Sequence, residues 1–287
     1  MSARLPDIER FFAASGASVL VRVAEARGSA PRETDAFMLV SAGQTCGTIG
    51  GGQLEYLAID QVRRMLRDGI MDADADIPLG PEIGQCCGGR VKLNFARLDS
   101  AGQRDLLKDV RAAEQSLPEI LIFGGGHVGR ALAVALAPLP YRVTLTDTRP
   151  EELRNLPVGI TSELAIMPEA LVRAAAPGTA YVVLTHDHAL DFLIMREVLL
   201  RGDAAYAGMI GSKTKKAQFR RWFLSEDGTL DRLDGLTCPI GGPVRDKRPE
   251  IIAALVVAEI IGAFGQGHCP KSPKDAKLIA QTQGAGE

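Results

Sequence analysis

The fold is decided by residues 119–147, which read EILIFGGGHVGRALAVALAPLPYRVTLTD. The first five residues form an apolar run, which is typical of a strand buried on both faces. A glycine-rich turn follows, and alanine, leucine and valine then continue at helical spacing up to Ala137. A second apolar run closes the stretch at Asp147. The pattern predicts a strand, a turn, a helix and a second strand, which is the first unit of a Rossmann-type parallel sheet.

The glycines of this turn have the spacing G-x-G-x-x-G, and each has a physical task. Gly124 permits the tight turn, Gly126 lets a phosphate approach the backbone, and Gly129 lets the helix pack closely on the strand. The unpaired N–H groups at the start of the helix attract an anion, and we expect His127 to point towards it from the first turn. Asp147 stands where a dinucleotide-binding protein holds the ribose. These residues are therefore candidate ligand contacts.

Length and composition indicate an ordinary globular protein of about two domains. The chain has 287 residues, of which 46% are hydrophobic and 24% are charged. The net charge of -2 and the isoelectric point near 6.1 argue against a nucleic-acid or anionic-membrane partner. No apolar run is long enough to span a bilayer, and no apolar leader begins the chain, so we expect a cytoplasmic protein. Five cysteines in no disulfide pattern agree with a reducing compartment.

The residue pattern predicts an α/β protein of two domains and a tail. We expect a smaller α+β domain over residues 1–117, a Rossmann-like domain with helices on both faces of a parallel sheet over residues 118–265, and a flexible tail over residues 266–287. In the first domain, strands are expected at residues 18–23, 37–40 and 91–95, helices at 7–15, 53–69 and 100–116, and an acidic connector at 72–76. In the second, further strands are expected at residues 164–167, 181–184 and 204–210, and further helices at 168–176, 189–200, 214–224 and 249–264.

A second glycine-rich stretch, GTIGGG at residues 47–52, opens directly onto the helix expected from residue 53. Glycines at a helix start leave N–H groups open to an anion, so this loop is a second candidate phosphate cradle. The alternative is a tight turn that only feeds the helix. The candidate contacts in this loop are Gly47, Thr48, Gly50, Gly51 and Gly52.

The stretch GQCCGG at residues 84–89 carries two adjacent cysteines between glycines. Thiolates on such bare backbone can bind a soft metal or take part in sulfur chemistry, which makes Cys86 and Cys87 candidate metal ligands and Gln85 a neighbouring contact. The alternative is a pair of small buried hydrophobic side chains. A zinc site is not indicated, because no second C-x-x-C pair exists in the chain.

Polar side chains also follow two of the expected strands of the second domain. His186 and His188 come directly after the strand at residues 181–184, and Lys213 follows the strand at 204–210. Because α/β proteins place ligands at the carboxyl ends of their strands, all three are candidate ligand contacts. The alternatives are structural histidines and a solvated basic helix face.

The motifs together resemble the XdhC/CoxI family, the xanthine dehydrogenase accessory proteins. The resemblance covers about residues 7–265, and GTIGGG and GQCCGG are its most specific parts. The motifs follow one another in the order GSAPRE (28–33), GTIGGGQLEY (47–56), GQCCGG (84–89), GGGHVGRAL (124–132), THDHALDF (185–192), GMIGSKTKKAQF (208–219) and CPIGGPVRDKRPEIIAALVVAEII (238–261).

The resemblance implies a chaperone for the molybdenum cofactor rather than an enzyme. Such a protein binds the molybdopterin form of the cofactor, shields it while a cysteine desulfurase supplies the terminal sulfido ligand, and delivers it to apo xanthine dehydrogenase. It would receive the cofactor from molybdenum cofactor biosynthesis proteins, and the family makes a homodimer plausible. Glycine-rich helix starts suit the phosphate of molybdopterin, and thiolates or imidazoles suit its molybdenum end.

Two other classes of function are left open by the residues themselves. The first is an NAD-dependent dehydrogenase with a small N-terminal substrate domain, which would use the Rossmann unit but gives no reason for Cys86 and Cys87. Whether NAD or another nucleotide binds at the Rossmann unit therefore stays open. The second is a structural interaction module, which leaves both glycine-rich helix starts unexplained.

Overall fold

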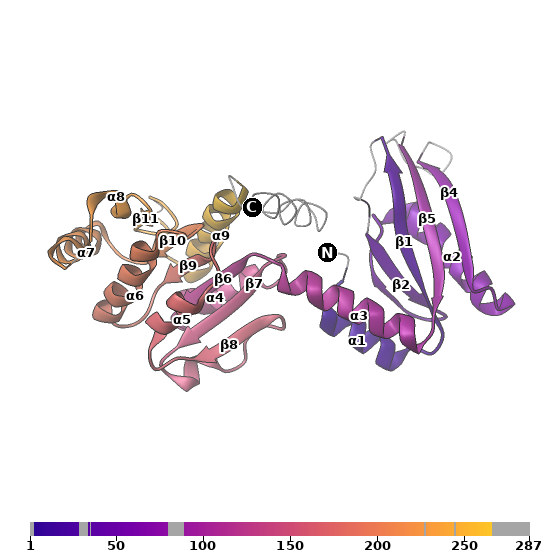
Figure 1. Cartoon of the computed structure of the whole chain (residues 1–287), viewed down its shortest axis with the longest axis horizontal. Coiled ribbons are helices and arrows are strands. Elements are labelled where there is room, and N and C mark those ends of the chain that lie inside the picture. The colour runs from indigo at the N-terminus through magenta and orange to yellow at the C-terminus, as the bar shows by residue number, and fades with distance from the viewer. Residues whose placement is uncertain are drawn as a thin grey trace, which may run out of the picture. The chain divides into compact units, whose positions relative to one another are not determined.

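A computed structural model of the chain describes residues 3–28, 34, 36–79, 89–226, 228–243 and 245–265 (Figure 1). The chain divides into two compact units, Met1–Ala113 and Glu114–Glu287. Among the described residues, no helix combines the length and the apolar character needed to cross a lipid bilayer. The residues predicted to form a flexible tail, 266–287, lie outside the described part of the chain.

The first unit is an antiparallel sheet with helices on both faces, as expected for an α+β domain. Its five strands have the order β3-β2-β1-β5-β4. The elements are α1 (Leu5–Ala14), β1 (Ser18–Arg27), β2 (Phe37–Ser41), β3 (Thr45–Gly47), α2 (Gly52–Asp68), β4 (Asp72–Leu79), β5 (Gly89–Leu98) and α3 (Ser100–Gln115).

Alternation along β1 builds both halves of this unit's core. Val19 and Val21 pack with Leu54 of α2 on one face of the sheet. Leu20 points to the other face and packs with Ile8 of α1 and with residues of α3. The helices that the sequence predicted around residues 7–15, 53–69 and 100–116 are confirmed as α1, α2 and α3.

The prediction of an acidic connector at residues 72–76 is wrong. Residues 72–79 form β4, which pairs antiparallel with β5 from Asp72 opposite Ala96 to Leu79 opposite Gly89. The sequence DADADIPL alternates with period two, which is the pattern of a strand, and its aspartates lie on an outer edge that charge protects from pairing with other chains. Asp76 also forms an ion pair with Arg90 of β5 at 2.6 Å.

The second unit is a parallel sheet with helices on both faces, as the sequence predicted. Its six strands have the order β11-β10-β9-β6-β7-β8. Its elements are β6 (Glu119–Phe123), α4 (His127–Leu136), β7 (Arg142–Asp147), η2 (Pro150–Leu153), β8 (Ile160–Leu164), α5 (Pro168–Ala174), β9 (Ala180–Val183), α6 (His188–Arg201), β10 (Tyr206–Met209), α7 (Lys213–Ser225), α8 (Leu230–Leu233), β11 (Leu236–Thr237) and α9 (Pro249–Gly265).

This strand order is that of a doubly wound dinucleotide-binding sheet, in which the order reverses between β6 and β9. The two halves of the core again follow strand alternation. Ile120 and Ile122 of β6 pack on the α4 and α9 side, while Leu121 and Phe123 pack on the side of α5, α6 and α7. The crevice outside the carboxyl ends of β6 and β9 is therefore the place where this fold binds ligands.

The strand predicted at residues 164–167 is misplaced. The outer strand β8 covers Ile160–Leu164, and Ile166 and Met167 after it are exposed, with Ile166 at 89% of its full area. The strand itself reads ITSEL and is mostly exposed, because an edge strand needs little apolar surface. The short β11 was not predicted, since two residues carry no periodic pattern.

Gly129→Ala tests the close packing of α4 on the sheet. A Cβ atom at Gly129 would lie 1.9 Å from the carbonyl oxygen of Gly124. We expect a loss of about 1–3 kcal/mol or more in the free energy of unfolding, because the clash is with a backbone atom, which can move only if the loop or the helix shifts. Urea unfolding followed by the fluorescence of Trp222, the single tryptophan, reports on this unit because Trp222 packs against its core.

Gly262→Ala in α9 is the matched control. A Cβ at Gly262 would meet no atom within 4 Å, so this variant should gain about 0.5–1 kcal/mol from its better helix propensity. Equal stabilities for the two variants would contradict the packing role of Gly129.

Candidate functional site

The glycines of the fingerprint loop divide into those that pack and one that faces open space. An added Cβ at Gly124, whose φ is +117°, would lie 2.4 Å from the carbonyl oxygen of Leu184. Gly129 lies against Gly124 in the same way, as described above. A Cβ at Gly126 would meet no atom within 4 Å. Gly126 is the residue that precedes α4, and no side chain caps the helix there. The approach to the first N–H groups of α4 is therefore open to a ligand.

His127 and Asp147 lie where the sequence placed them, but their environments differ. His127 is the first residue of α4 and is exposed. Asp147 is the last residue of β7 and is only 5% exposed. A buried carboxylate needs partners, and those of Asp147 come from the protein itself.

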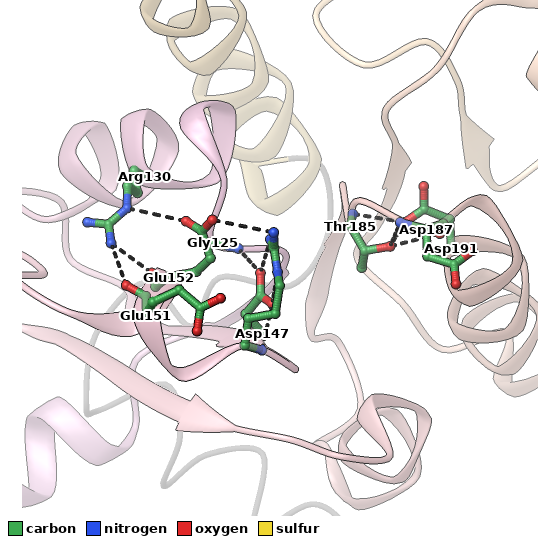
Figure 2. Close-up of polar contacts among 9 residues, drawn as sticks. Gly125, Arg130, Asp147, Glu151, Glu152, Thr185, Asp187 and Asp191 are labelled. Atoms are coloured by element: carbon green, nitrogen blue, oxygen red, sulfur yellow. Dashed lines mark hydrogen bonds and ion pairs between the residues drawn. The ribbon is translucent and has the colours of Figure 1, made fainter.

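Asp147 is held by the fingerprint loop and by Arg149 (Figure 2). Its Oδ2 accepts a hydrogen bond from the N–H of Gly125 at 2.7 Å. The guanidinium of Arg149 donates to both carboxylate oxygens at 3.1 Å, and the N–H of Arg149 donates to Oδ1 at 2.9 Å. Burial opposes ionisation of Asp147, but these hydrogen bonds outweigh it and lower its pKa. The carboxylate that would hold a ribose is thus already bonded within the chain.

The turn η2 lies against the fingerprint loop beside Asp147. Arg130 of α4 donates to the carbonyl oxygens of Arg154 at 2.9 Å and Glu152 at 3.0 Å. Arg149 also pairs with the carboxylate of Glu152 at 3.4 Å. A Cβ at Gly125 would lie 2.7 Å from the carbonyl oxygen of Glu152, so the two segments are in close contact (Figure 2). This network fills the side of the loop that faces Asp147.

The loop after β9 carries the two predicted histidines on its surface. His186 and His188 are exposed, and His188 begins α6. Asp187 caps that helix by accepting from the N–H of Ala189 at 2.8 Å. Both imidazoles are therefore accessible to a ligand at this edge of the sheet.

The first turn of α7, after β10, carries the exposed Lys213 and the buried Lys215. Lys213, the predicted ligand contact, is exposed at the start of α7, where the side chain of Ser212 caps the helix. Lys215 is buried and pairs with the buried carboxylate of Asp191 in α6. Sequence reasoning missed this pair. Its one signal was an acid inside the apolar stretch of residues 189–195.

The glycine-rich loop at residues 47–52 is closed by a carboxylate of its own. Oε1 of Glu55 accepts from the N–H groups of Ile49 at 3.2 Å and Gly51 at 2.9 Å, and from the hydroxyl of Thr48. Positive φ angles at Gly47, Gly50, Gly51 and Gly52 shape the loop. Glu55 thus occupies donors that a ligand phosphate would use, and a phosphate there must use other N–H groups at the start of α2.

Gln85, Cys86 and Cys87, the predicted metal contacts, lie outside the described residues. In the part of the chain that the structure describes, Cys46 and Cys238 are free thiols. Burial is the main reason that the pKa of each is raised, so neither is activated as a thiolate. No group of three or more histidine, cysteine or acidic side chains among the described residues is placed to hold a metal ion.

A doubly wound sheet with an open glycine fingerprint and a sequestered Asp147 defines a Rossmann-type domain. Two family models match the chain, the XdhC Rossmann domain over residues 120–260 and the XdhC and CoxI family over residues 12–72. The chain therefore belongs to the XdhC/CoxI family.

Two known proteins show how far this likeness extends. The uncharacterized protein YqeB of Escherichia coli K12 is 26% identical over an alignment 293 residues long, which covers 93% of this chain and 48% of YqeB. The chain thus spans about half the length of this curated relative. A solved structure of a xanthine dehydrogenase from Bacillus halodurans has the same fold, with a TM-score of 0.74 and 17% identity, and the match covers 96% of this chain and 99% of that one. The family models place the chain in the XdhC/CoxI family, and the solved structure shares its fold.

Asp147→Asn tests whether this carboxylate serves the structure of the loop. An amide places a donor against Arg149 and Gly125, so we expect a loss of about 1.5–3 kcal/mol in unfolding free energy at pH 7. Because the pKa of Asp147 is lowered on folding, its contribution is complete above the unfolded value of about 4 and is lost as the pH falls through the folded value. The difference between variant and wild type should therefore shrink below about pH 4.

Urea unfolding followed by Trp222 fluorescence measures this difference at each pH. Asp234→Asn, at an exposed residue that follows α8 in the same unit as Trp222, is the control for a general loss of charge. A difference that stays constant from pH 7 to pH 3 would show that Asp147 does not act through its charge.

Proposed function

We propose that this protein binds the molybdenum cofactor as molybdopterin, holds it during sulfuration and delivers it to apo xanthine dehydrogenase. It acts as a chaperone rather than an enzyme. A cysteine desulfurase supplies the sulfido ligand, and cofactor biosynthesis proteins supply the molybdopterin. We further propose that it works in the cytoplasm as a homodimer. Membership of the XdhC/CoxI family supports this assignment.

The observation that carries the proposal is the combination of an open Gly126 and a sequestered Asp147. The start of α4 remains accessible to a phosphate, as molybdopterin requires. Asp147 is bonded to Gly125 and Arg149, so a nicotinamide dinucleotide loses the carboxylate that normally holds its ribose. A pterin with a phosphate monoester needs no such partner.

The remaining contacts of the bound cofactor are proposed from residue chemistry. The exposed Lys213, His186 and His188 lie on a loop and on helix starts at the ligand edge of the same sheet and suit an anionic ligand. Cys86 and Cys87 are proposed as soft ligands for molybdenum. The cofactor supplies the redox chemistry of the enzyme that receives it, while these side chains bind it, orient it and shield it.

An NAD-dependent dehydrogenase is the competing function, and the strand order and glycine fingerprint favour it. Calorimetry of the wild-type protein with NAD separates the two. We expect no binding at useful affinity. A micromolar dissociation constant that is lost on Asp147→Ala would overturn the chaperone assignment, because Asp147 would then hold a ribose.

Gly126→Ala should weaken molybdopterin binding and leave the fold intact. The backbone of Gly126, with φ of -65°, is open to alanine, and the added Cβ enters free space. We expect the affinity to fall about tenfold or more, because a hydrogen bond from the helix start to a charged phosphate contributes about 1.5–3 kcal/mol. Titration scored by co-elution of molybdenum measures the loss. Gly262→Ala is the control. Equal affinities for both variants would show that the phosphate does not bind at this loop.

Cys86→Ala combined with Cys87→Ala should lower the retention of molybdenum while the far-ultraviolet circular dichroism of the folded protein is unchanged. Loss of a soft ligand weakens the hold on the metal end of the cofactor, and phosphate contacts remain. Molybdenum content after gel filtration measures retention, with Cys46→Ala as the control. If the double variant keeps as much molybdenum as wild type, the two thiols are not ligands.

A further inference from the structure

Asp191 and Lys215 form a buried ion pair between two helices of the second unit. Asp191 is fully buried in the first turn of α6, and Lys215 is 6% exposed in the first turn of α7. The helices follow β9 and β10, which are neighbours in the sheet. The pair therefore joins the two loops at the carboxyl ends of these strands, next to the crevice that the fold uses for ligands.

The partners of Asp191 extend this link into the loop after β9. Oδ1 of Asp191 accepts from the N–H of Thr185 at 2.9 Å and from its hydroxyl at 2.7 Å (Figure 2). Oδ2 accepts from Nζ of Lys215. Both carboxylate oxygens are thus bonded, one to Thr185 in the loop after β9 and the other to Lys215 in α7.

The backbone after β10 is fitted closely to the lysine. A Cβ atom at Gly211 would lie 2.7 Å from Cδ of Lys215, so the turn passes directly over the stem of this side chain. Ser212 then caps α7 by accepting from the N–H of Lys215 at 3.2 Å. Moving Lys215 would therefore move the turn that carries Lys213.

Stability alone is a weak reason for this arrangement. Removing two charges from water costs several kcal/mol for each ion, and replacing a buried pair with apolar side chains is often neutral or stabilising by about 1–4 kcal/mol. The surrounding residues offer an apolar alternative, because Ile194, Met195 and Phe219 of the same two helices lie in one core cluster. What an ion pair adds to apolar packing is a single defined geometry.

We propose that Asp191 and Lys215 are positioning residues for an anionic, phosphate-bearing ligand. The pair holds the loop of Thr185 and the turn of Gly211 in one arrangement. His186, which follows Thr185, and Lys213, which lies two residues before Lys215, are thereby presented together at the edge of the sheet. Neither Asp191 nor Lys215 touches the ligand. This inference rests on the proposed function of the site.

The test replaces the pair by apolar residues, Asp191→Leu with Lys215→Met. We expect the urea midpoint reported by Trp222 to equal or exceed that of wild type, while molybdopterin affinity falls about 10- to 100-fold, as when outer-shell partners of a binding site are removed. Hydrogen exchange followed by mass spectrometry should show faster exchange at residues 185–188 and 211–214, with β9 and β10 unchanged.

The matched control is Arg201→Met with Asp203→Leu, at the opposite end of α6. This pair, joined at 2.7 Å, also loses one positive and one negative charge, but Arg201 is the last residue of α6 and Asp203 follows the helix. Its removal should leave molybdopterin affinity and the exchange of residues 185–188 as in wild type. A purely structural role for Asp191 and Lys215 predicts instead that affinity follows stability in both double variants.

Thr185→Val keeps the test decisive if the apolar pair fails to fold. It removes the hydroxyl bonds to Asp191 and to the backbone of Asp187 but keeps the N–H bond to Asp191 and the side-chain volume, so a smaller loss of affinity and of exchange protection is expected. Wild-type affinity and exchange in a folded variant would overturn the inference. If wild type itself does not bind molybdopterin, the proposed function fails, and the exchange measurement still decides whether the pair holds the loops.

Discussion

The structure of the second unit depends on the contact between Gly129 of α4 and the carbonyl oxygen of Gly124, which leaves no room for a side chain. This approach seats the helix on the sheet and leaves its first N–H groups at the carboxyl edge of β6. Gly125 is then near enough to bond Asp147 at the end of β7, so the helix, the loop and two strands form one rigid corner. Any side chain at position 129 would push α4 away from the loop and would therefore disturb the helix, the loop and both strands at once.

Carboxylates of the chain occupy places where ligands are often bound. Asp147 takes up the N–H of Gly125, and Glu55 takes up the N–H groups of Ile49 and Gly51 in the first unit. Both loops are thereby preorganised before any ligand arrives. The consequence differs between them, because the open space at Gly126 remains beside the first loop. A fold typical of dinucleotide enzymes can therefore serve another ligand, since function resides in side chains rather than in strand order.

The distribution of charge at the ligand edge follows the same logic. Asp191 and Lys215 are buried and bonded to each other, whereas Lys213, His186 and His188 remain exposed around them. Buried charges define the geometry of the loops. Exposed charges can reach an anion from solvent, although water weakens the attraction between them. The proposed chaperone, which would both hold and release an anionic cofactor, would be well served by contacts of moderate strength on a rigid base.

Most strands of the two sheets, most of the helices and the glycine fingerprint could be predicted from the sequence, because these depend on local periodicity and on backbone freedom at named glycines, whereas β3, β4 and β11 were not predicted. The alternation of DADADIPL also indicates the strand at residues 72–79, but the acidic composition of this stretch led to the prediction of a connector. Only the tertiary structure decided that Asp147 faces Arg149 and Gly125, and that Lys215 rather than Lys213 is buried against Asp191. The reason is physical: burial and hydrogen-bond partners arise where segments distant in sequence meet, and no local period encodes which side chains face each other there.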